Sequence, residues 1–348
     1  MKTIIEDMTT GISAEGIARA GEILKNGGLV AFPTETVYGL GANALDEKAA
    51  AKIYAAKGRP SDNPLIVHIA CLEALEGIVE QVPETAWLLA KAFWPGPLTM
   101  IFRKNERVPY GTTGGLDTVA VRMPDHEIAR EMILSGGGYI AAPSANTSGR
   151  PSPTTAAHVA EDLSGRIDMI IDGGSVGIGL ESTIVDLSGD TPVILRPGYI
   201  NQEMLCGIIG SVEMDKGLIA ADSGIRPKAP GMKYKHYAPK ADLVIIEGQP
   251  DRVVEKINKL IAEGEKKGER IGVIGTDETR EAYRGGIVKS IGSIHEELTI
   301  AQHLYGILRE FDDLSVTKIY SEAFETPKMG QAIMNRLIKA AGHQIWKV

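Results

Sequence analysis

The sequence of 348 residues contains few cysteines and no long hydrophobic run. Cys71 and Cys206 are too few and too far apart for a disulfide framework or a thiolate metal site. No apolar run approaches the roughly 18 to 20 residues that cross a bilayer, and Glu6 and Asp7 stand where a secretory signal would be basic and then apolar. We therefore expect a cytoplasmic protein with no membrane contact.

Positive charge is scarce in the first part of the chain, and aromatic residues are scarce throughout. Residues 1–200 hold 16 Lys and Arg against 24 Asp and Glu, whereas residues 201–348 hold 21 of each. This balance and the aromatic content of 5% disfavour a broad surface that contacts nucleic-acid phosphates and stacks on bases. A local exception is the segment 226–240, which has five basic residues and no acidic one.

The length allows about two domains at roughly 150 residues each, and proline indicates where they meet. Because 16 of the 18 prolines lie at or before Pro239, we place a linker at 211–240. Beyond it, short apolar runs alternate with segments of helical spacing. The predicted strands are 242–247, 270–275, 286–292 and 316–322, and the predicted helices are 251–268, 297–313 and 328–343. This pattern predicts a small Rossmann-like parallel-sheet domain over 241–348, although it lacks the GxGxxG loop of a dinucleotide site.

The first 210 residues predict an α/β domain with a mixed sheet. The predicted helices are 13–26, 47–56, 84–93, 125–135 and 154–163. The predicted strands are 28–32, 65–69, 98–102, 118–122, 139–142, 168–171, 183–187 and 192–195.

Two loops that adjoin predicted strands carry polar side chains suited to a ligand. LVAFPTETVYGLGAN (29–43) is a strand that runs into a proline-threonine turn with the hydroxyls of Thr34 and Thr36, and then into two glycines. A β-turn capped by hydroxyls is the alternative. KIYAAKGRPSDNPLIVHI (52–69) places Lys57 and Arg59 on a loop that suits a polyanion, although composition alone favours a solvated basic turn. His68, in the strand of that segment, is by default a buried structural histidine.

A second set of motifs adds arginine and small hydroxyl residues. Arg122 lies in an apolar strand, on the same face as Thr118. A buried arginine needs an anionic partner, either a protein carboxylate or a substrate carboxylate, and we favour the substrate. YIAAPSANTSGRPSPT (139–154) could form an anion-binding nest around Ser144, and no GxSxG elbow supports a nucleophilic serine. Ser182 and Arg196 follow in IIDGGSVGIGLESTIVDLSGDTPVILRPG (170–198), and no Walker loop occurs.

Together, the motifs PTETVYGLG, KGRPSDNPL, APSAN, ESTIVD and RPG strongly resemble the YrdC-like domain. The continuation into PGMKYKHYAP and an α/β tail is similar to the long form of the threonylcarbamoyl-AMP synthase family. This resemblance covers essentially the whole chain. It implies a YrdC-like catalytic domain at 1–210 with a twisted mixed sheet and flanking helices, a linker and lid at 211–240, and a smaller Rossmann-like parallel-sheet domain at 241–348.

The resemblance also implies an activity and its partners. Enzymes of this family combine L-threonine, bicarbonate (or CO2) and ATP into threonylcarbamoyl-AMP and pyrophosphate, a nucleotidyltransferase reaction. A downstream threonylcarbamoyl-transferase complex then uses the product to modify the adenosine next to the anticodon of tRNA. ATP would carry Mg2+, and no tightly bound, protein-ligated metal is expected.

Roles for individual residues follow from the same resemblance. The threonine pocket would be lined by Thr36, His68, Arg122, Ala142 (through its backbone) and Ser182. ATP would be held by Arg59, Asn63, Thr118, Ser144, Ser152, Arg196 and Tyr237, with Lys57 and Arg59 as the catalytic pair.

Two other functions remain open from the sequence. The same basic loops could hold RNA in a translation-associated binding module, although the acidic first part opposes this. A carbamoyl-adenylate activity in metalloenzyme maturation is the other, although two cysteines cannot build the zinc fingers that accompany such domains.

Overall fold

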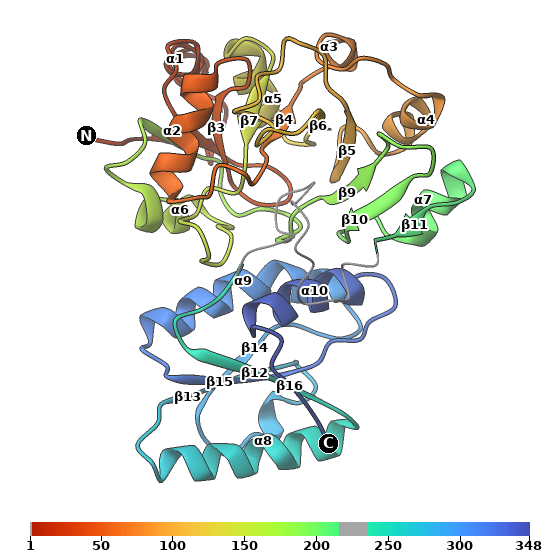
Figure 1. Cartoon of the computed structure of the whole chain (residues 1–348). Coiled ribbons are helices and arrows are strands. Elements are labelled where there is room, and N and C mark those ends of the chain that lie inside the picture. The colour runs from red at the N-terminus through yellow and green to blue at the C-terminus, as the bar shows by residue number, and fades with distance from the viewer. Residues whose placement is uncertain (1, 216–235) are drawn as a thin grey trace. The chain divides into compact units, whose positions relative to one another are not determined.

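The computed structural model describes residues 2–215 and 236–348 (Figure 1). The chain forms two compact units. The N-terminal unit comprises Met1–Ser148, Ser152–Gly177 and Glu181–Lys233, and the C-terminal unit comprises Gly149–Pro151, Ile178–Leu180 and Tyr234–Val348. Most of the predicted linker, including most of the basic segment 226–240, lies outside the described residues.

The N-terminal unit contains a large mixed sheet, as the sequence predicts. Its strands are β1 (Ile4–Asp7), β2 (Val30–Phe32), β3 (Gly39–Asn43), β4 (Ile66–His68), β5 (Leu98–Arg103), β6 (Thr118–Arg122), β7 (Ile140–Ala142), β8 (Met169–Asp172), β9 (Thr183–Asp186), β10 (Val193–Arg196) and β11 (Glu213–Met214). They are ordered β1-β8-β2-β3-β7-β4-β6-β5-β9-β10-β11. The sheet combines parallel pairs, such as β4 with β6, and antiparallel pairs, such as β5 with β6.

Helices pack on this sheet and bury its apolar residues. They are α1 (Ala14–Lys25), α2 (Glu47–Lys57), α3 (Glu73–Glu76), α4 (Glu84–Phe93), α5 (Glu127–Ser135), α6 (Ala156–Leu163) and α7 (Gln202–Ile209). One core cluster includes Ile53 of α2 and Leu89 of α4, and a second includes Leu24 of α1 and Met132 of α5. The helices predicted at 13–26, 47–56, 84–93, 125–135 and 154–163 all form, whereas β1, α3, α7 and β11 were not predicted.

Strand β3 was also missed, because its glycines resemble a turn. Gly39 and Gly41 face Phe32 and Val30 in an antiparallel pair, so residues 33–38 form the connecting loop. A Cβ on Gly41 would lie 2.9 Å from Cγ2 of Ile140 and 3.2 Å from the carbonyl oxygen of Val30. Close packing inside the sheet, rather than a turn, therefore explains this glycine.

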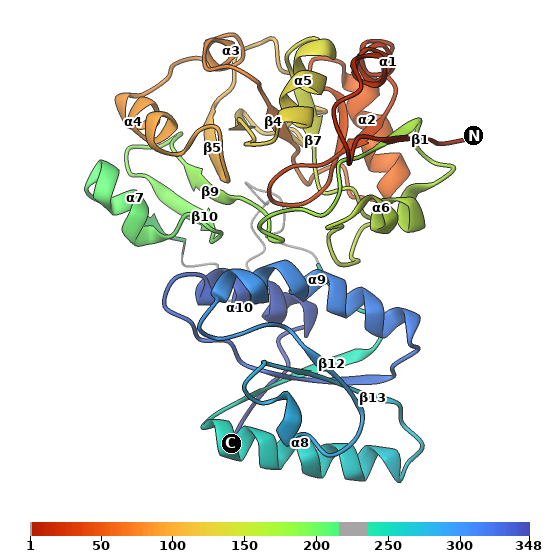
Figure 2. The same ribbon diagram turned by 180° about the vertical axis from the view of Figure 1, so that it is seen from behind.

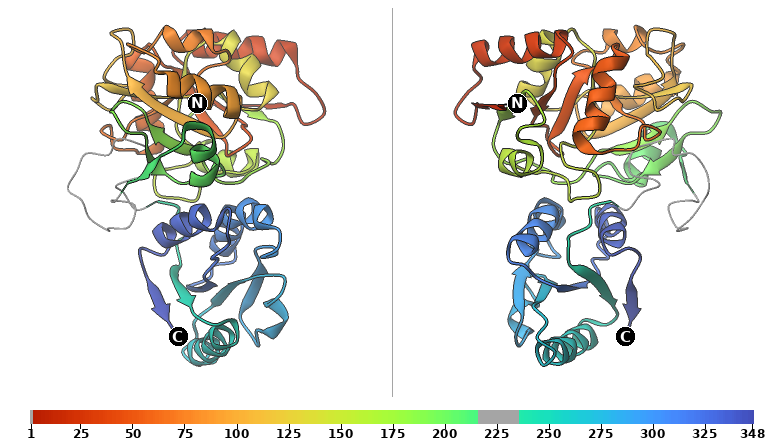
Figure 3. Two further views of the ribbon diagram at one scale, coloured as in Figure 1. Left: turned by 90° about the vertical axis from the view of Figure 1, so that its right-hand side faces the viewer. Right: turned by 60° about the vertical axis from the view of Figure 1, so that its left-hand side comes forward.

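The C-terminal unit is a parallel sheet with helices on both faces, which confirms the predicted Rossmann-like class. Its strands are β12 (Asp242–Glu247), β13 (Ile271–Gly275), β14 (Ile287–Ser290), β15 (Lys318–Glu322) and β16 (Ile345–Lys347), ordered β14-β13-β15-β12-β16. Its helices are α8 (Pro250–Glu265), η2 (Arg280–Ala282), α9 (Glu297–Asp313) and α10 (Gly330–Ala340). Helix α8 covers one face, and α9 and α10 cover the other (Figures 2 and 3).

The C-terminal end of helix α2 positions the loop that carries Arg59. Helix α2 is capped at its N-terminus by Asp46, whose side chain accepts a hydrogen bond from the backbone N–H of Lys48, and at its C-terminus by Gly58 in the left-handed region (φ 62°). The N–H of Arg59 donates to the carbonyl of Tyr54 at 2.9 Å, which turns the chain sharply after Lys57.

Within the described residues, no helix is long and apolar enough to cross a membrane.

Candidate active site

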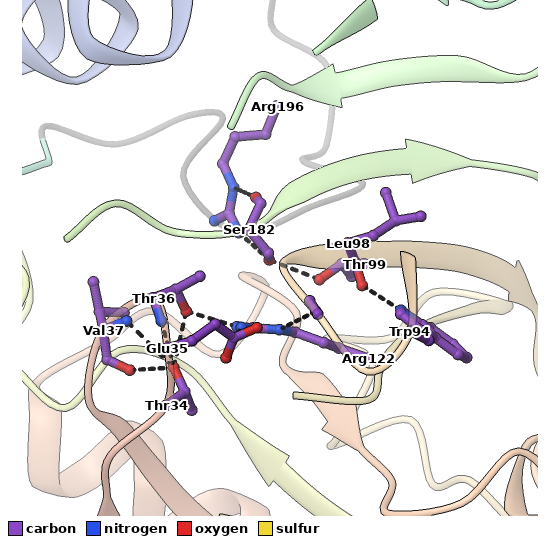
Figure 4. A network of polar contacts seen from close by, with 11 residues as sticks. Thr34, Glu35, Thr36, Val37, Trp94, Leu98, Thr99, Arg122, Ser182 and Arg196 are labelled. Carbon is purple, nitrogen blue, oxygen red and sulfur yellow. Dashed lines mark hydrogen bonds and ion pairs between the residues drawn. The ribbon is translucent and has the colours of Figure 1, made fainter. Parts of the chain in front are cut away.

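Arg122 ends the central strand β6 and forms the centre of a buried polar network (Figure 4). The residue is 4% exposed. Its Nη1 donates to Oγ1 of Thr36 at 2.8 Å, and its Nε donates to the carbonyl of Gly96 at 3.4 Å. Its Nη2 lies 2.7 Å from Oε2 of Glu35 in an ion pair. The anionic partner of this arginine in the structure is therefore a protein carboxylate.

The loop after β2 is held by its own threonines. The hydroxyls of Thr34 and Thr36 lie 2.9 Å apart, and Thr34 donates to the carbonyl of Val37 at 2.7 Å. Both threonines are buried. These contacts fix the backbone of the loop, and Thr36 consequently presents its hydroxyl to Arg122.

His68 and Ala142 lie on β4 and β7, the next two strands of the sheet on one side of β6. His68 is directly opposite Arg122 on β4, and Ala142 is opposite Ile66 on the next strand, β7. His68 is buried, with Nδ1 3.1 Å from the carbonyl oxygen of Ile66. Burial, followed by the nearby Arg122 charge, lowers the pKa of His68 from 6.5 to about 3. The imidazole beside Arg122 is therefore uncharged at neutral pH.

A second buried guanidinium belongs to Arg196 at the end of β10. Its Nε donates to the carbonyl of Ser182 at 3.0 Å, and its Nη2 donates to Oγ of the same serine at 3.2 Å. The Ser182 hydroxyl lies 2.8 Å from that of Thr99, which stands opposite Arg122 on β5. A series of hydrogen bonds thus runs from Arg196 through Ser182 to Thr99, on the strand next to that of Arg122 (Figure 4).

Lys57 joins the end of α2 to the serine-rich loop. It is 3% exposed, and its Nζ donates to the carbonyls of Ser144, at 2.5 Å, and of Asn146. Oγ of Ser144 lies 2.6 Å from Oδ1 of Asn146. Lys57 therefore organises the loop on which Ser144 lies.

The loop after α2 holds Arg59 and Asn63. Arg59 donates to the carbonyls of Asn63 at 3.3 Å and of Pro64 at 3.2 Å. Asn63 is 2% exposed, and its Oδ1 is buried without a hydrogen-bond partner among the described residues. A buried acceptor of this kind is a candidate for contact with a ligand.

Three predicted site residues remain, namely Thr118, Ser152 and Tyr237. Thr118 begins β6, four residues from Arg122 and hence about 13 Å along the strand. Ser152 is buried and donates to Oε1 of Glu181 at 2.6 Å. Tyr237 belongs to the C-terminal unit, where its ring packs on that of Tyr305 with centroids 5.2 Å apart.

Glu35 and Thr99 were not selected from the sequence, although each contacts a selected residue. Glu35 lies between the two threonines of the PTET motif, and the requirement of Arg122 for an anion could have identified it. The role of Thr99 depends on strand register, which the sequence does not show. Across the described residues, no group of three or more His, Cys, Asp or Glu side chains is placed to hold a metal ion.

Comparisons with known proteins agree with the predicted family. A family model described as "Telomere recombination" matches residues 22–198, and a model described as "Threonylcarbamoyl-AMP synthase, C-terminal domain" matches residues 200–342. The threonylcarbamoyl-AMP synthase of Pyrococcus abyssi is 50% identical over 346 residues, covering 99% of this chain and 100% of that protein. The enzyme of Bacillus subtilis is 51% identical over 342 residues, covering 97% of each.

Solved structures show the same fold. The crystal structure of Pyrococcus abyssi Sua5 complexed with L-threonine superposes with a TM-score of 0.94 and 49% identity, covering 99% of this chain and 100% of that one. Escherichia coli YciO, at a TM-score of 0.53 and 24% identity over 59% of this chain and 98% of its own, shares the fold of the N-terminal part. The comparisons favour a synthase over an RNA-binding module. Two family models in tandem and half-identical relatives of the same length leave one conclusion, that the chain is an enzyme belonging to the threonylcarbamoyl-AMP synthase family.

Proposed function

We propose that the chain condenses L-threonine, bicarbonate or CO2, and ATP into threonylcarbamoyl-AMP and pyrophosphate. The observation that carries this proposal is a pair of buried guanidinium groups, those of Arg122 and Arg196. Arg196 donates to the hydroxyl of Ser182, which in turn lies within hydrogen-bond distance of the Thr99 hydroxyl on the strand beside that of Arg122. A substrate pair with one carboxylate and one polyphosphate needs two such cationic groups.

The threonine pocket in this proposal surrounds Arg122. The guanidinium would bind the amino-acid carboxylate, since it can donate two parallel hydrogen bonds. Thr36 and Ser182 would offer hydroxyls, and the uncharged His68 would avoid repelling the α-amino group. The backbone of Ala142, at the end of β7, would complete the pocket.

The nucleotide would be held by the loops around Lys57 and by Arg196. Lys57 fixes the loop of Ser144 and places its own charge beside it, and Arg59 lies on the loop of Asn63. We assign Arg59, Asn63, Thr118, Ser144, Ser152, Arg196 and Tyr237 to ATP. Lys57 and Arg59 would neutralise the phosphate charge that develops as pyrophosphate leaves.

The reaction needs no side-chain nucleophile. The threonine nitrogen attacks CO2, loses a proton and becomes a carbamate. A carbamate oxygen then attacks the α-phosphorus of ATP, and the bond from that phosphorus to the pyrophosphate oxygen breaks. Catalysis is chiefly positioning and charge neutralisation, and Mg2+ would enter with the ATP phosphates and neutralise part of their charge.

The remaining parts of the chain have proposed roles as well. Residues 1–210 would form the catalytic domain, 211–240 a linker and lid, and 241–348 an accessory α/β domain. A lid would shield the carbamate from water. The mixed anhydride formed here is an activated acyl donor, so a downstream threonylcarbamoyl transferase would consume it and tRNA would receive the group.

A direct assay tests the proposed function. Purified protein is incubated with ATP and bicarbonate together with L-threonine, L-serine or L-valine, while released pyrophosphate and the mass of any adenylate are measured. We expect threonine-dependent pyrophosphate and an adenylate whose mass rises by one when ¹³C-bicarbonate replaces bicarbonate. Pyrophosphate release without a labelled adenylate would refute the proposal.

A further inference from the structure

Glu35 occupies the position that the proposed substrate requires. Its Oε2 lies 2.7 Å from Nη2 of Arg122, and the two side chains are 14% and 5% exposed. A carboxylate of the chain itself therefore neutralises the guanidinium assigned to the threonine carboxylate. Given the proposed function, on which this inference rests, threonine has to bind a guanidinium that is already paired.

The contact between Glu35 and Arg122 is held by charge alone. Both carboxylate oxygens of Glu35 are buried and accept no hydrogen bond from the described residues. A carboxylate has about four acceptor positions, and leaving them unused in a buried place costs free energy. The backbone on either side is fixed by Thr34 and Thr36, so the Glu35 side chain is the part that can move.

A second group lies within electrostatic reach of the same carboxylate. His126, the residue before helix α5, has its Nδ1 buried without a hydrogen-bond partner among the described residues. Burial lowers the pKa of His126, while the carboxylate of Glu35, followed by those of Asp125 and Glu127, acts in the opposite direction by favouring the imidazolium. Glu35 thus contacts the guanidinium of Arg122 and acts electrostatically on an imidazole whose Nδ1 has no hydrogen-bond partner among the described residues.

We propose that Glu35 is a stand-in for the substrate carboxylate: it pairs with Arg122 in the empty site and moves toward His126 when threonine binds. An empty site without this partner would contain an unpaired buried guanidinium, which costs several kcal/mol. Displacement has a cost in affinity, because a ligand binds only the fraction of molecules in which Arg122 is free. If that fraction is about one in ten, the apparent Kd for threonine is about tenfold higher than the intrinsic value.

A purely structural role predicts the opposite sign. If Glu35 only aligned Arg122 and stayed paired during binding, its removal would weaken the binding of threonine. The two roles are therefore separated by the direction of one measured change.

The test uses E35Q, which keeps the shape of the side chain and removes its charge. Calorimetric titration of the full-length protein with L-threonine should give a Kd about tenfold lower than in the unsubstituted protein. L-Threoninamide, which lacks the carboxylate, should show no such gain. E15Q, on the exposed side of α1, is the matched control and should leave both values unchanged.

A shorter carboxylate provides a second variant should E35Q be unstable. E35D keeps the charge but reaches less far toward Arg122, so we expect a smaller gain in threonine affinity than in E35Q. Binding of threonine that is unchanged or weaker in both variants would overturn the proposal.

A double-mutant cycle tests the receiving position. H126A should weaken threonine binding in the unsubstituted protein, since the displaced carboxylate loses its second partner, and should have no effect in the E35Q background. Equal effects in both backgrounds would overturn the movement toward His126. Failure of the proposed function is recognised separately, because the unsubstituted protein would then make no threonine-dependent adenylate.

Discussion

The buried, uncharged His68 makes a quantitative prediction about acid stability. Folding lowers the pKa of this imidazole from 6.5 to about 3. The unfolded chain therefore binds a proton at pH values where the folded chain does not, and stability falls as pH decreases from 6.5 toward 3. Between pH 7 and pH 5 this group alone should cost about 2 kcal/mol of unfolding free energy. Because pH 5 lies well above the folded pKa, that figure depends almost entirely on the unfolded value.

The measurement is urea unfolding at pH 7 and pH 5, with and without His68→Gln. The chain has three tryptophans, of which Trp87 and Trp94 belong to the N-terminal unit and Trp346 to the C-terminal unit. In a W346F background, fluorescence consequently reports the N-terminal unit. His68→Gln should lose about 2 kcal/mol less than the parent on acidification.

The control for this experiment is His295→Gln, since His295 is exposed in the C-terminal unit. It should leave the pH dependence of the fluorescence transition unchanged. An identical pH dependence in the parent and in His68→Gln would refute the assignment of a neutral buried imidazole beside Arg122.

Three further substitutions, the first with a matched control, test the packing and the proposed roles. Gly41→Ala places a methyl group 2.9 Å from the Ile140 side chain and should reduce the unfolding free energy by about 1–3 kcal/mol; Gly207→Ala in α7, where no atom lies within 4 Å of an added Cβ, should not reduce it. Arg122→Ala should raise the KM for threonine at least tenfold more than the KM for ATP, and steady-state kinetics showing the reverse ratio would contradict our assignment. Lys57→Met, measured by pyrophosphate release, should lower kcat at least 100-fold, and unchanged turnover would remove Lys57 from the reaction.

The sequence predicts most helices and strands of this protein because their apolar periodicity is local. The helix at 84–93 and the strand at 118–122 are recovered with the same bounds. Strand β3 is different, since its five residues GLGAN contain two glycines that are explained only by Phe32 and Ile140 packed against them. Those neighbours come from other strands, so the local pattern contains no sign of them.

At the site, too, local sequence predicts some features, whereas others depend on residues that are distant in the sequence. The burial of Arg122 can be inferred from its apolar strand, and the structure places it at 4% exposure. Which carboxylate neutralises it depends on the loop after β2 folding back over β6, and 86 residues separate Thr36 from Arg122. The need for an anion at Arg122 can therefore be predicted from the sequence, whereas the identity of Glu35 as that anion is known only from the fold.

Three of the few basic residues in residues 1–200 are buried, and their burial requires an explanation. Of the 16 basic residues there, the described buried ones are Lys57, Arg122 and Arg196, and each was assigned to the site from its motif. Burying a cation costs several kcal/mol unless an anion or several acceptors compensate it. In the structure Lys57 donates to two carbonyl oxygens, Arg196 donates to the carbonyl and the hydroxyl of Ser182, and Arg122 pairs with Glu35. Three cations kept inside a domain that is otherwise acidic are therefore costly to folding, and binding of the proposed substrates, which bring a carboxylate and phosphates, would account for their retention.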